Sequence, residues 1–157
     1  MTTKDIIRQK RPSADPPFDR FITYRIWRLS SKMTRQGAAI LRMSNGLKMP
    51  EWRVITFLCA YGPLTGAKIS ELSGVDPGLL SRVFRSLEDR GLISTQRRSE
   101  NRREVEGSLT QKGRELYEET LPRMAPRQKR LMDSLTPEER TVFFDLVAKL
   151  ERAVDAE

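Results

Sequence analysis

The sequence has 157 residues, with 29 basic and 21 acidic side chains, a net charge of +8, one cysteine and no histidine. Without histidine, a His-based general base and the usual Cys/His zinc site are both excluded, and a lone cysteine excludes an intramolecular disulfide. Glycine-rich phosphate-binding motifs are absent from the sequence as well. We therefore expect a protein that is not an enzyme and has no metal site or other cofactor. The excess positive charge favours a polyanionic partner such as nucleic acid.

Membrane and secretion signals are missing from the printed sequence. No apolar run approaches the roughly 18 residues that a membrane span requires, and the N-terminus lacks the apolar core of a signal peptide. These features predict a cytoplasmic protein with no membrane partner. Residues 1–17 are polar and end in Asp15-Pro16-Pro17, which predicts a flexible arm. Lys10 and Arg11 could enter a DNA minor groove, and a tail without any contact is the alternative.

The first long helix is predicted to begin near Phe18 and to run towards Met43, before the turn signal Asn45-Gly46. It carries one apolar stripe at three- and four-residue steps, formed by Phe18, Phe21, Ile22, Ile26, Leu29 and Met33. A second helix starts at Pro50 and ends at Gly62-Pro63. Cys59 lies in an apolar run of this helix, and we interpret it as a small buried hydrophobe rather than a redox sensor.

Two short helices follow, separated by a tight turn. The first is capped by Thr65, directs Ile69 and Leu72 towards the core, and is closed by Gly74. The second restarts at Asp76, which is a strong N-cap, with Pro77 at the first helical position. Such a pair, joined through glycine, is typical of a helix-turn-helix.

The second helix of this pair has the composition of a DNA-recognition helix. Its inward stripe consists of Leu80, Val83, Phe84 and Leu87. Its other face carries small and basic residues that suit a major groove, and the candidate DNA contacts are Pro77, Gly78, Leu79, Ser81, Arg82 and Arg85. Arg82 and Arg85 are the candidate guanine readers. The alternative is a solvated arginine face without a partner.

A basic hairpin is predicted directly after this helix. Gly91 ends the helix, residues 92–96 and 105–109 form two strands, and an arginine-rich tip containing one acid, Glu100, joins them. The tip is either a solvated loop or a wing that grips the DNA backbone and minor groove. Its candidate DNA-binding residues are Arg97, Arg98, Asn101, Arg102 and Arg103.

The C-terminal third is predicted to be helical. Thr110 caps a long region that Gly113, Pro122 and Pro126 should kink or divide. Its basic residues, Arg123, Arg127, Lys129 and Arg130, are interpreted as a solvated face. A capping box, Thr136-Pro137-Glu138-Glu139, starts a last helix with the apolar stripe Val142, Phe143, Leu146, Val147, Leu150 and Val154. The first and last helices are too apolar to stay exposed, so we expect them to pack in a homodimer. Packing within one chain is the alternative.

This order of elements resembles the MarR family of bacterial transcriptional regulators. The most specific matches are Gly91-Leu92-Ile93, then Asn101-Arg102-Arg103 in the hairpin, and then the run from Ser108 to Gly113. Asn101 stands where the family prefers aspartate, and Ser94-Thr95 replaces arginines that often follow the first motif. An asparagine cannot form the charge-assisted bond of an aspartate, so the wing would be held less firmly.

The resemblance implies a mainly α fold with a small β-hairpin wing, in which N- and C-terminal dimerisation helices flank a winged helix-turn-helix. Residues 18–48 and 111–157 would dimerise, and residues 49–110 would form the DNA-binding lobe. A homodimer would bind double-stranded DNA at a pseudo-palindromic operator as a repressor. A small amphipathic or phenolic effector would bind between arm and lobe.

Four side chains flank that junction and could line an effector pocket: Tyr24, Trp27, Met49 and Trp52. The alternative for these four is ordinary core. The alternatives for the protein as a whole are a protein-interaction module built on a winged helix, a regulator without a ligand, and a thiol-based sensor that uses Cys59.

Overall fold

The computed structural model describes residues 20–97 and 104–156. The predicted arm, the start of the first helix at Phe18 and the hairpin tip lie outside these ranges. The elements in chain order are α2 (Ile22–Ser44), α3 (Met49–Tyr61), β1 (Leu64–Thr65), α4 (Gly66–Ser73), α5 (Pro77–Asp89), β2 (Ile93–Arg97), β3 (Val105–Leu109), α6 (Gln111–Asp133) and α7 (Pro137–Asp155).

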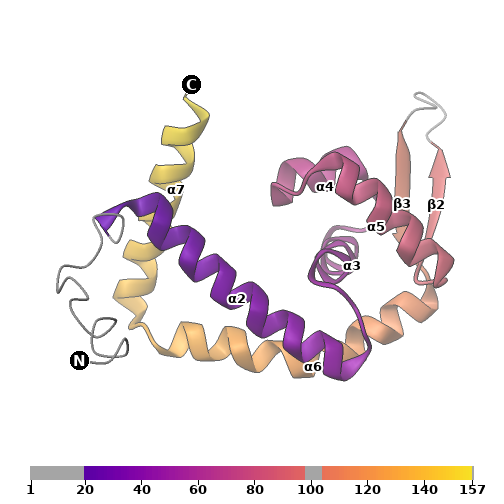
Figure 1. Ribbon diagram of the computed structural model, residues 1–157, viewed down its shortest axis with the longest axis horizontal. Helices are drawn as coiled ribbons and strands as arrows, with labels where there is room; N and C mark the ends of the chain where they lie inside the picture. The colour runs from indigo at the N-terminus through magenta and orange to yellow at the C-terminus, as the bar shows by residue number, and fades with distance from the viewer. Residues whose placement is uncertain (1–19, 98–103, 157) are drawn as a thin grey trace, which may run out of the picture.

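These elements form a lobe and an arm (Figure 1). The lobe contains α3, α4, α5 and the sheet, and it holds almost all of the buried apolar side chains. The arm consists of α2 and α6, which run together away from the lobe, and α7, which rises at the far end. The predicted mainly α fold with a hairpin and long terminal helices is therefore confirmed.

Side-chain caps set the start of four helices, as the sequence predicted. In each case the capping oxygen accepts a hydrogen bond from the backbone N–H three residues further on, and this satisfies one of the otherwise unpaired donors of the first turn. The capping residues are Thr65, Asp76, Thr110 and Thr136. At the start of α7 the capping box is complete, because Glu139 also accepts from the N–H of Thr136 at 2.9 Å.

The sheet has three antiparallel strands in the order β1-β3-β2. The hairpin pairs Ile93 with Leu109 at its base and Arg97 with Val105 at its described end. The two-residue strand β1, which was not predicted, pairs with β3 on the opposite side from β2. Gly107 on β3 allows α5 to pack closely, because a Cβ at this position would lie 3.0 Å from the Phe84 ring.

The core confirms the inward stripe of α5 and corrects three other expectations. Leu72 was expected to face the core, but it is 43% exposed. The short helix α4 buries one residue, Ile69. Leu79 was expected to face DNA, but it is half buried against the core. Cys59 was expected to be buried, but it is exposed, since the buried face of α3 ends at Leu58. Burial, together with the neighbouring Cys59 thiol, raises the pKa of Tyr117 on α6.

The sequence left open whether the prolines of the long C-terminal helical region would kink it or divide it. Pro122 and Pro126 do not divide α6, which is one helix that changes direction along its length (Figure 1). Each proline lacks the N–H of a helical hydrogen bond, so a bend rather than a break accommodates both. Within the described ranges, no helix combines the length and apolar character needed to cross a membrane.

Candidate nucleic-acid interface

The outer face of α5 is the first part of the candidate interface. The Asp76 side chain accepts from the N–H of Leu79 at 2.9 Å, and Pro77 occupies the first helical position, so the start of the helix is fixed. Burial of one stripe leaves the other face open. Five of the six predicted contacts on this helix are exposed: Pro77, Gly78, Ser81, Arg82 and Arg85. The exposed face therefore combines small residues at its start with two arginines further along.

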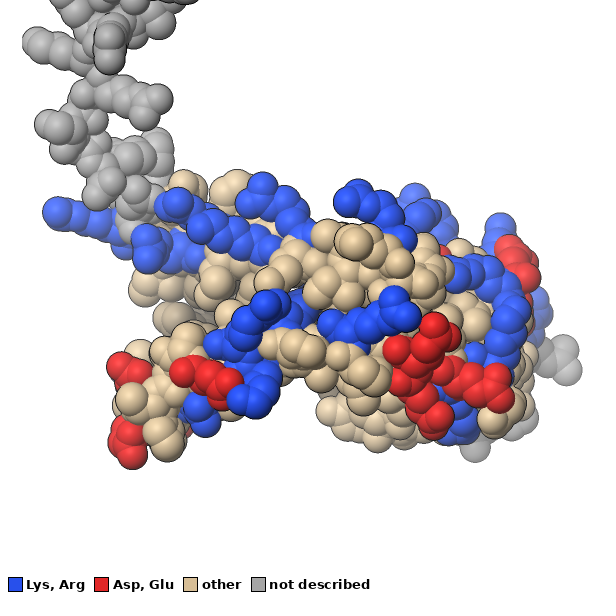
Figure 2. Space-filling model, turned by 90° about the horizontal axis from the view of Figure 1, so that it is seen from below, with Lys and Arg blue, Asp and Glu red and all other residues tan. Residues whose placement is uncertain are grey.

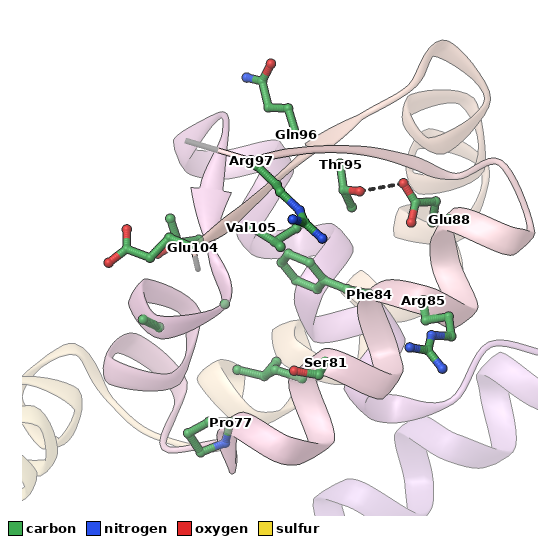
Figure 3. A pocket seen from close by; sticks show the side chains of 14 residues that line it. Pro77, Ser81, Phe84, Arg85, Glu88, Thr95, Gln96, Arg97, Glu104 and Val105 are labelled. Carbon is green, nitrogen blue, oxygen red and sulfur yellow. Dashed lines mark hydrogen bonds between the residues drawn. The ribbon is translucent and has the colours of Figure 1, made fainter. Parts of the chain in front are cut away.

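The hairpin forms the second part and lies beside α5 across a groove of about 710 Å³. Ser81, Phe84 and Arg85 line it from α5, and Arg97 and Val105 line it from the hairpin (Figure 3). Figure 3 shows Arg97 directed from β2 into this groove, with the Phe84 ring below it in that view. The structure thus brings two predicted sites, the recognition helix and the base of the wing, together on one surface.

The remaining predicted wing residues, Arg98, Asn101, Arg102 and Arg103, lie outside the described ranges. Their assignment stays a prediction from the sequence.

A hydrogen bond from the Thr95 hydroxyl to the Glu88 carboxylate connects β2 to the end of α5 (Figure 3). The sequence gave no role to Thr95 beyond its replacement of a family arginine. In the structure its hydroxyl links the hairpin to α5. This hydrogen bond adds to the packing of Phe84 against Gly107 in positioning the hairpin relative to α5.

Replacing Thr95 by valine should weaken binding to duplex DNA of any sequence by about two- to fivefold, because an exposed, charge-assisted hydrogen bond contributes about 0.5–1 kcal/mol. Thermal stability should change little. The matched control is Ser94→Ala, which alters the exposed neighbour on β2. Fluorescence anisotropy with a labelled duplex measures the DNA affinity of both variants. Equal affinities for the two variants would show that the contact does not position the wing.

The sequence analysis did not identify a buried carboxylate that lies behind α5. Glu51 is 4% exposed, and its oxygens accept from the Ser86 hydroxyl at 2.7 Å and from the Lys48 N–H at 2.7 Å. The Arg90 guanidinium lies 3.4 Å from the same carboxylate. Ser86 and Arg90 belong to the end of α5, so Glu51 ties this helix to the start of α3. An acid three residues after a helix N-cap was the available signal.

The network continues into the arm. Arg90 also lies 3.4 Å from the backbone oxygen of Asn45, which caps the end of α2. The Asn45 amide in turn donates to the buried Thr120 hydroxyl of α6 at 2.6 Å. Polar contacts therefore connect α2, α3, α5 and α6 at the junction of arm and lobe.

The four predicted pocket residues fall into two separate pairs within the chain. Met49 and Trp52 are buried at the start of α3, where the Trp52 ring stacks on Tyr117 at 5.4 Å. Tyr24 and Trp27 lie near the start of α2, with ring centroids 6.0 Å apart, and Trp27 is 64% exposed. Met49 instead approaches α2 at Gly37, ten residues after Trp27, or about 15 Å along the helix. The chain alone does not enclose one pocket with all four.

Comparison with known proteins agrees with this geometry. The MarR family profile matches residues 47–105, which cover the lobe through to the start of β3. The crystal structure of a MarR/EmrR family transcriptional regulator from Acinetobacter sp. ADP1 is 30% identical, covers 90% of this chain and 100% of its own, and superposes with a TM-score of 0.83. The chain therefore belongs to the MarR family, and it is a transcriptional regulator of that family.

Two further relatives show the range of this similarity. The organic hydroperoxide resistance transcriptional regulator of Bacillus subtilis is 29% identical over 100 residues, which are 64% of this chain and 67% of that protein. NadR, solved in complex with 4-hydroxyphenylacetate, is 23% identical over 90% of this chain and 96% of its own, with a TM-score of 0.70. The second match shows a shared fold.

Proposed function

We propose that this regulator is a repressor that binds a pseudo-palindromic operator as a homodimer, and that a small amphipathic or phenolic compound lowers its affinity for DNA. The observation that carries the proposal is the joint surface of α5 and the hairpin, where Arg85 and Arg97 line one groove with Ser81, and where Arg82 is also exposed on α5. Residues 49–110 form the DNA-binding lobe in this proposal, and residues 18–48 and 111–157 form the dimerisation region.

On this proposal, α5 enters a major groove and the hairpin follows the adjacent backbone. Arg82 and Arg85 read base edges, and a bidentate arginine–guanine contact discriminates by about 1–3 kcal/mol. Arg97 contacts phosphate, which positions the protein without reading sequence. In a symmetric dimer the two recognition helices occupy successive major grooves, roughly 34 Å apart.

Unburied apolar surface on the arm supports the homodimer. No residue of α7 is buried, although the helix carries large apolar side chains. The first turns of α2 are similar, with Phe21, Ile22 and Ile26 all more than half exposed. Exposed patches of this kind mark interfaces, and pairing of the terminal helices of two chains would cover both at once.

Effector control would follow from linkage. A compound that binds more tightly to a dimer whose lobes are wrongly spaced for the operator must weaken DNA binding. By linkage, DNA weakens the binding of the compound by the same factor. The 4-hydroxyphenylacetate bound by the structural relative NadR supports a phenolic compound as effector.

The test is a salt-dependent titration of the protein against its own upstream DNA and a scrambled duplex. We expect preferential binding of a dimer to the upstream duplex. Arg85→Ala should lower affinity for that duplex by about tenfold or more and reduce the preference over the scrambled one.

Arg97→Ala is the matched comparison, because it removes the same side chain from the wing. It should weaken binding to both duplexes equally and reduce the slope of log K against log salt by about 1 per site. Equal binding of the unaltered protein to both duplexes would refute an upstream operator. Identical behaviour of the two variants would refute the division into base-reading and phosphate-binding residues.

A further inference from the structure

Helix α2 carries a row of basic side chains along one side. They follow one another at steps of three, four and seven residues, so they share one face of the helix. These residues form the α2 basic stripe, and all are exposed: Arg25, Arg28, Lys32, Arg35 and Arg42. At a rise of about 1.5 Å per residue, the stripe extends over roughly 25 Å.

The stripe is directed away from the helices on which α2 packs. Arg28 lies nine residues before Gly37, and nine residues are about two and a half turns, so the two positions are on opposite sides of the helix. The same spacing separates Lys32 from Leu41. Gly37 and Leu41 are the buried residues of α2, which packs on α3 and α6. Figure 2 shows Lys and Arg side chains spread along the molecule, with acidic side chains gathered nearer its ends.

No acidic residue of α2 balances this charge. The helix contains neither Asp nor Glu, and Arg25, Lys32 and Arg35 form no ion pair with any residue that the structure describes. Helix α6 differs, because acids are mixed with its basic residues and both Arg123 and Lys129 form ion pairs within the helix. Like charges at three- and four-residue spacing destabilise a helix, whereas a solvated face normally mixes both signs. An unmixed stripe therefore indicates an anionic partner.

We propose that the α2 basic stripe is a second, sequence-independent binding surface for the phosphate backbone of duplex DNA. It is separate from the operator interface, since α2 does not line the groove between α5 and the hairpin. Four of the five stripe residues are arginines, and a planar guanidinium binds phosphate through two parallel hydrogen bonds. The length of the stripe corresponds to about seven base pairs at about 3.4 Å per pair.

An anionic membrane suits this helix less well than DNA. An amphipathic helix binds a membrane by burying its apolar face among the lipids. In α2 one side already packs on α3 and α6, and the exposed Phe21, Ile22 and Ile26 belong to the proposed dimer interface. Only the charged side is left for another partner. A duplex held by the lobes would also raise the concentration of phosphate near the arm, and this step alone rests on the proposed function.

The experiment compares two variants that lose the same charge from different helices. The α2 variant combines Arg25→Gln, Lys32→Gln and Arg35→Gln. The control combines Arg123→Gln, Lys129→Gln and Arg130→Gln, which also removes two arginines and one lysine from exposed positions, here on α6. Anisotropy titrations at several salt concentrations use a scrambled duplex that extends several helical turns beyond the length of the operator.

The α2 variant should bind this duplex at least about tenfold more weakly than the unaltered protein. The slope of log K against log salt should fall by about 2–3, because each phosphate contact contributes about 0.9. The control should stay within about threefold in affinity and change the slope by less than about 1. Equal losses in the two variants would overturn the proposal, since overall charge would then account for the effect.

A charge-preserving variant separates the contact from damage to the helix. Arg25→Lys combined with Arg35→Lys keeps every positive charge and should retain the salt slope. Circular dichroism and sedimentation velocity check that folding and oligomeric state are unchanged in all variants. A slope as low as that of the α2 variant would overturn the proposal, because the charges would then not be what binds DNA.

A membrane partner and the failure of the operator are both distinguishable outcomes. Suppose that vesicles of phosphatidylserine and phosphatidylcholine bind the unaltered protein and the control but not the α2 variant, while the DNA slope does not depend on the stripe. The stripe would then be a lipid surface and the proposal would be overturned. If the protein shows no preference for its upstream duplex but the α2 variant still loses salt slope, the proposed operator fails and the second DNA surface stands.

Discussion

Replacing Glu51 by leucine is expected to lower the free energy of unfolding by about 2–3 kcal/mol. Leucine roughly preserves side-chain volume, so the loss is chiefly that of an acceptor. The Ser86 hydroxyl and the Lys48 N–H would then be left without their partner. Arg90 adds less, because its side chain is 37% exposed and water can replace the carboxylate. Denaturant unfolding, with the midpoint and slope fitted together, measures the change.

Two controls separate this effect from a general loss of charge. Glu51→Gln keeps an acceptor of the same shape and should cost only about 1 kcal/mol. Glu71→Gln removes an exposed carboxylate that pairs with Lys68 at 2.7 Å, and it should change stability by less than about 0.5 kcal/mol. If Glu51→Leu were no more destabilising than Glu71→Gln, the network around Glu51 would have no structural importance.

Local rules predicted most of the lobe. N-caps such as Asp76 act on the first turn of their own helix, and the apolar stripe of α5 repeats with the helical period, so both can be read from neighbouring residues. The hairpin was predicted within one residue for the same reason. These features depend on contacts close in sequence, and the exposed face of α5 followed directly from its buried stripe.

Features that depend on distant residues could not be predicted in this way. Strand β1 has two residues and exists because β3, some forty residues later, offers it a free edge. Cys59 has the same apolar neighbours in sequence as buried residues, and only the packing direction of α3 leaves it exposed. Arg127 was interpreted as part of a solvated basic face. In the structure it approaches Gly37, and a contact between residues ninety positions apart could not be read from the sequence.

The candidate effector pocket shows the same limit. Three aromatic residues and Met49 were grouped because they are near a predicted hinge, but Met49 of α3 approaches α2 at Gly37, ten residues after Trp27. The terminal helices are a different case. Their apolar stripes were read from the sequence, and within the described chain α7 buries no residue of its own. The single chain does not bury these stripes, so their proposed role in dimerisation has to be tested by measuring the oligomeric state.

If the proposed dimer forms through α7, Leu146→Glu is expected to convert it to a monomer and to lower operator affinity by about 100-fold or more. Leu146 is 55% exposed in the single chain and lies near the exposed Phe143 on the same face. A carboxylate there should be tolerated by the monomer, but in an interface it would be buried without a partner. In a dimer, once one lobe has bound its half of the operator, the second lobe binds the other half in an intramolecular step. A monomer loses the gain in affinity that this step provides.

Sedimentation velocity and operator titration measure the two effects together. The matched control is Thr141→Glu, which introduces the same charge at an exposed position on the opposite face of α7. It should remain a dimer and bind operator normally. Helical content and thermal unfolding of the single lobe should be similar in both variants, since α7 contributes no buried residue to it. If Leu146→Glu stayed dimeric, α7 would not form the interface; a monomer with full operator affinity would instead show that one lobe suffices for binding.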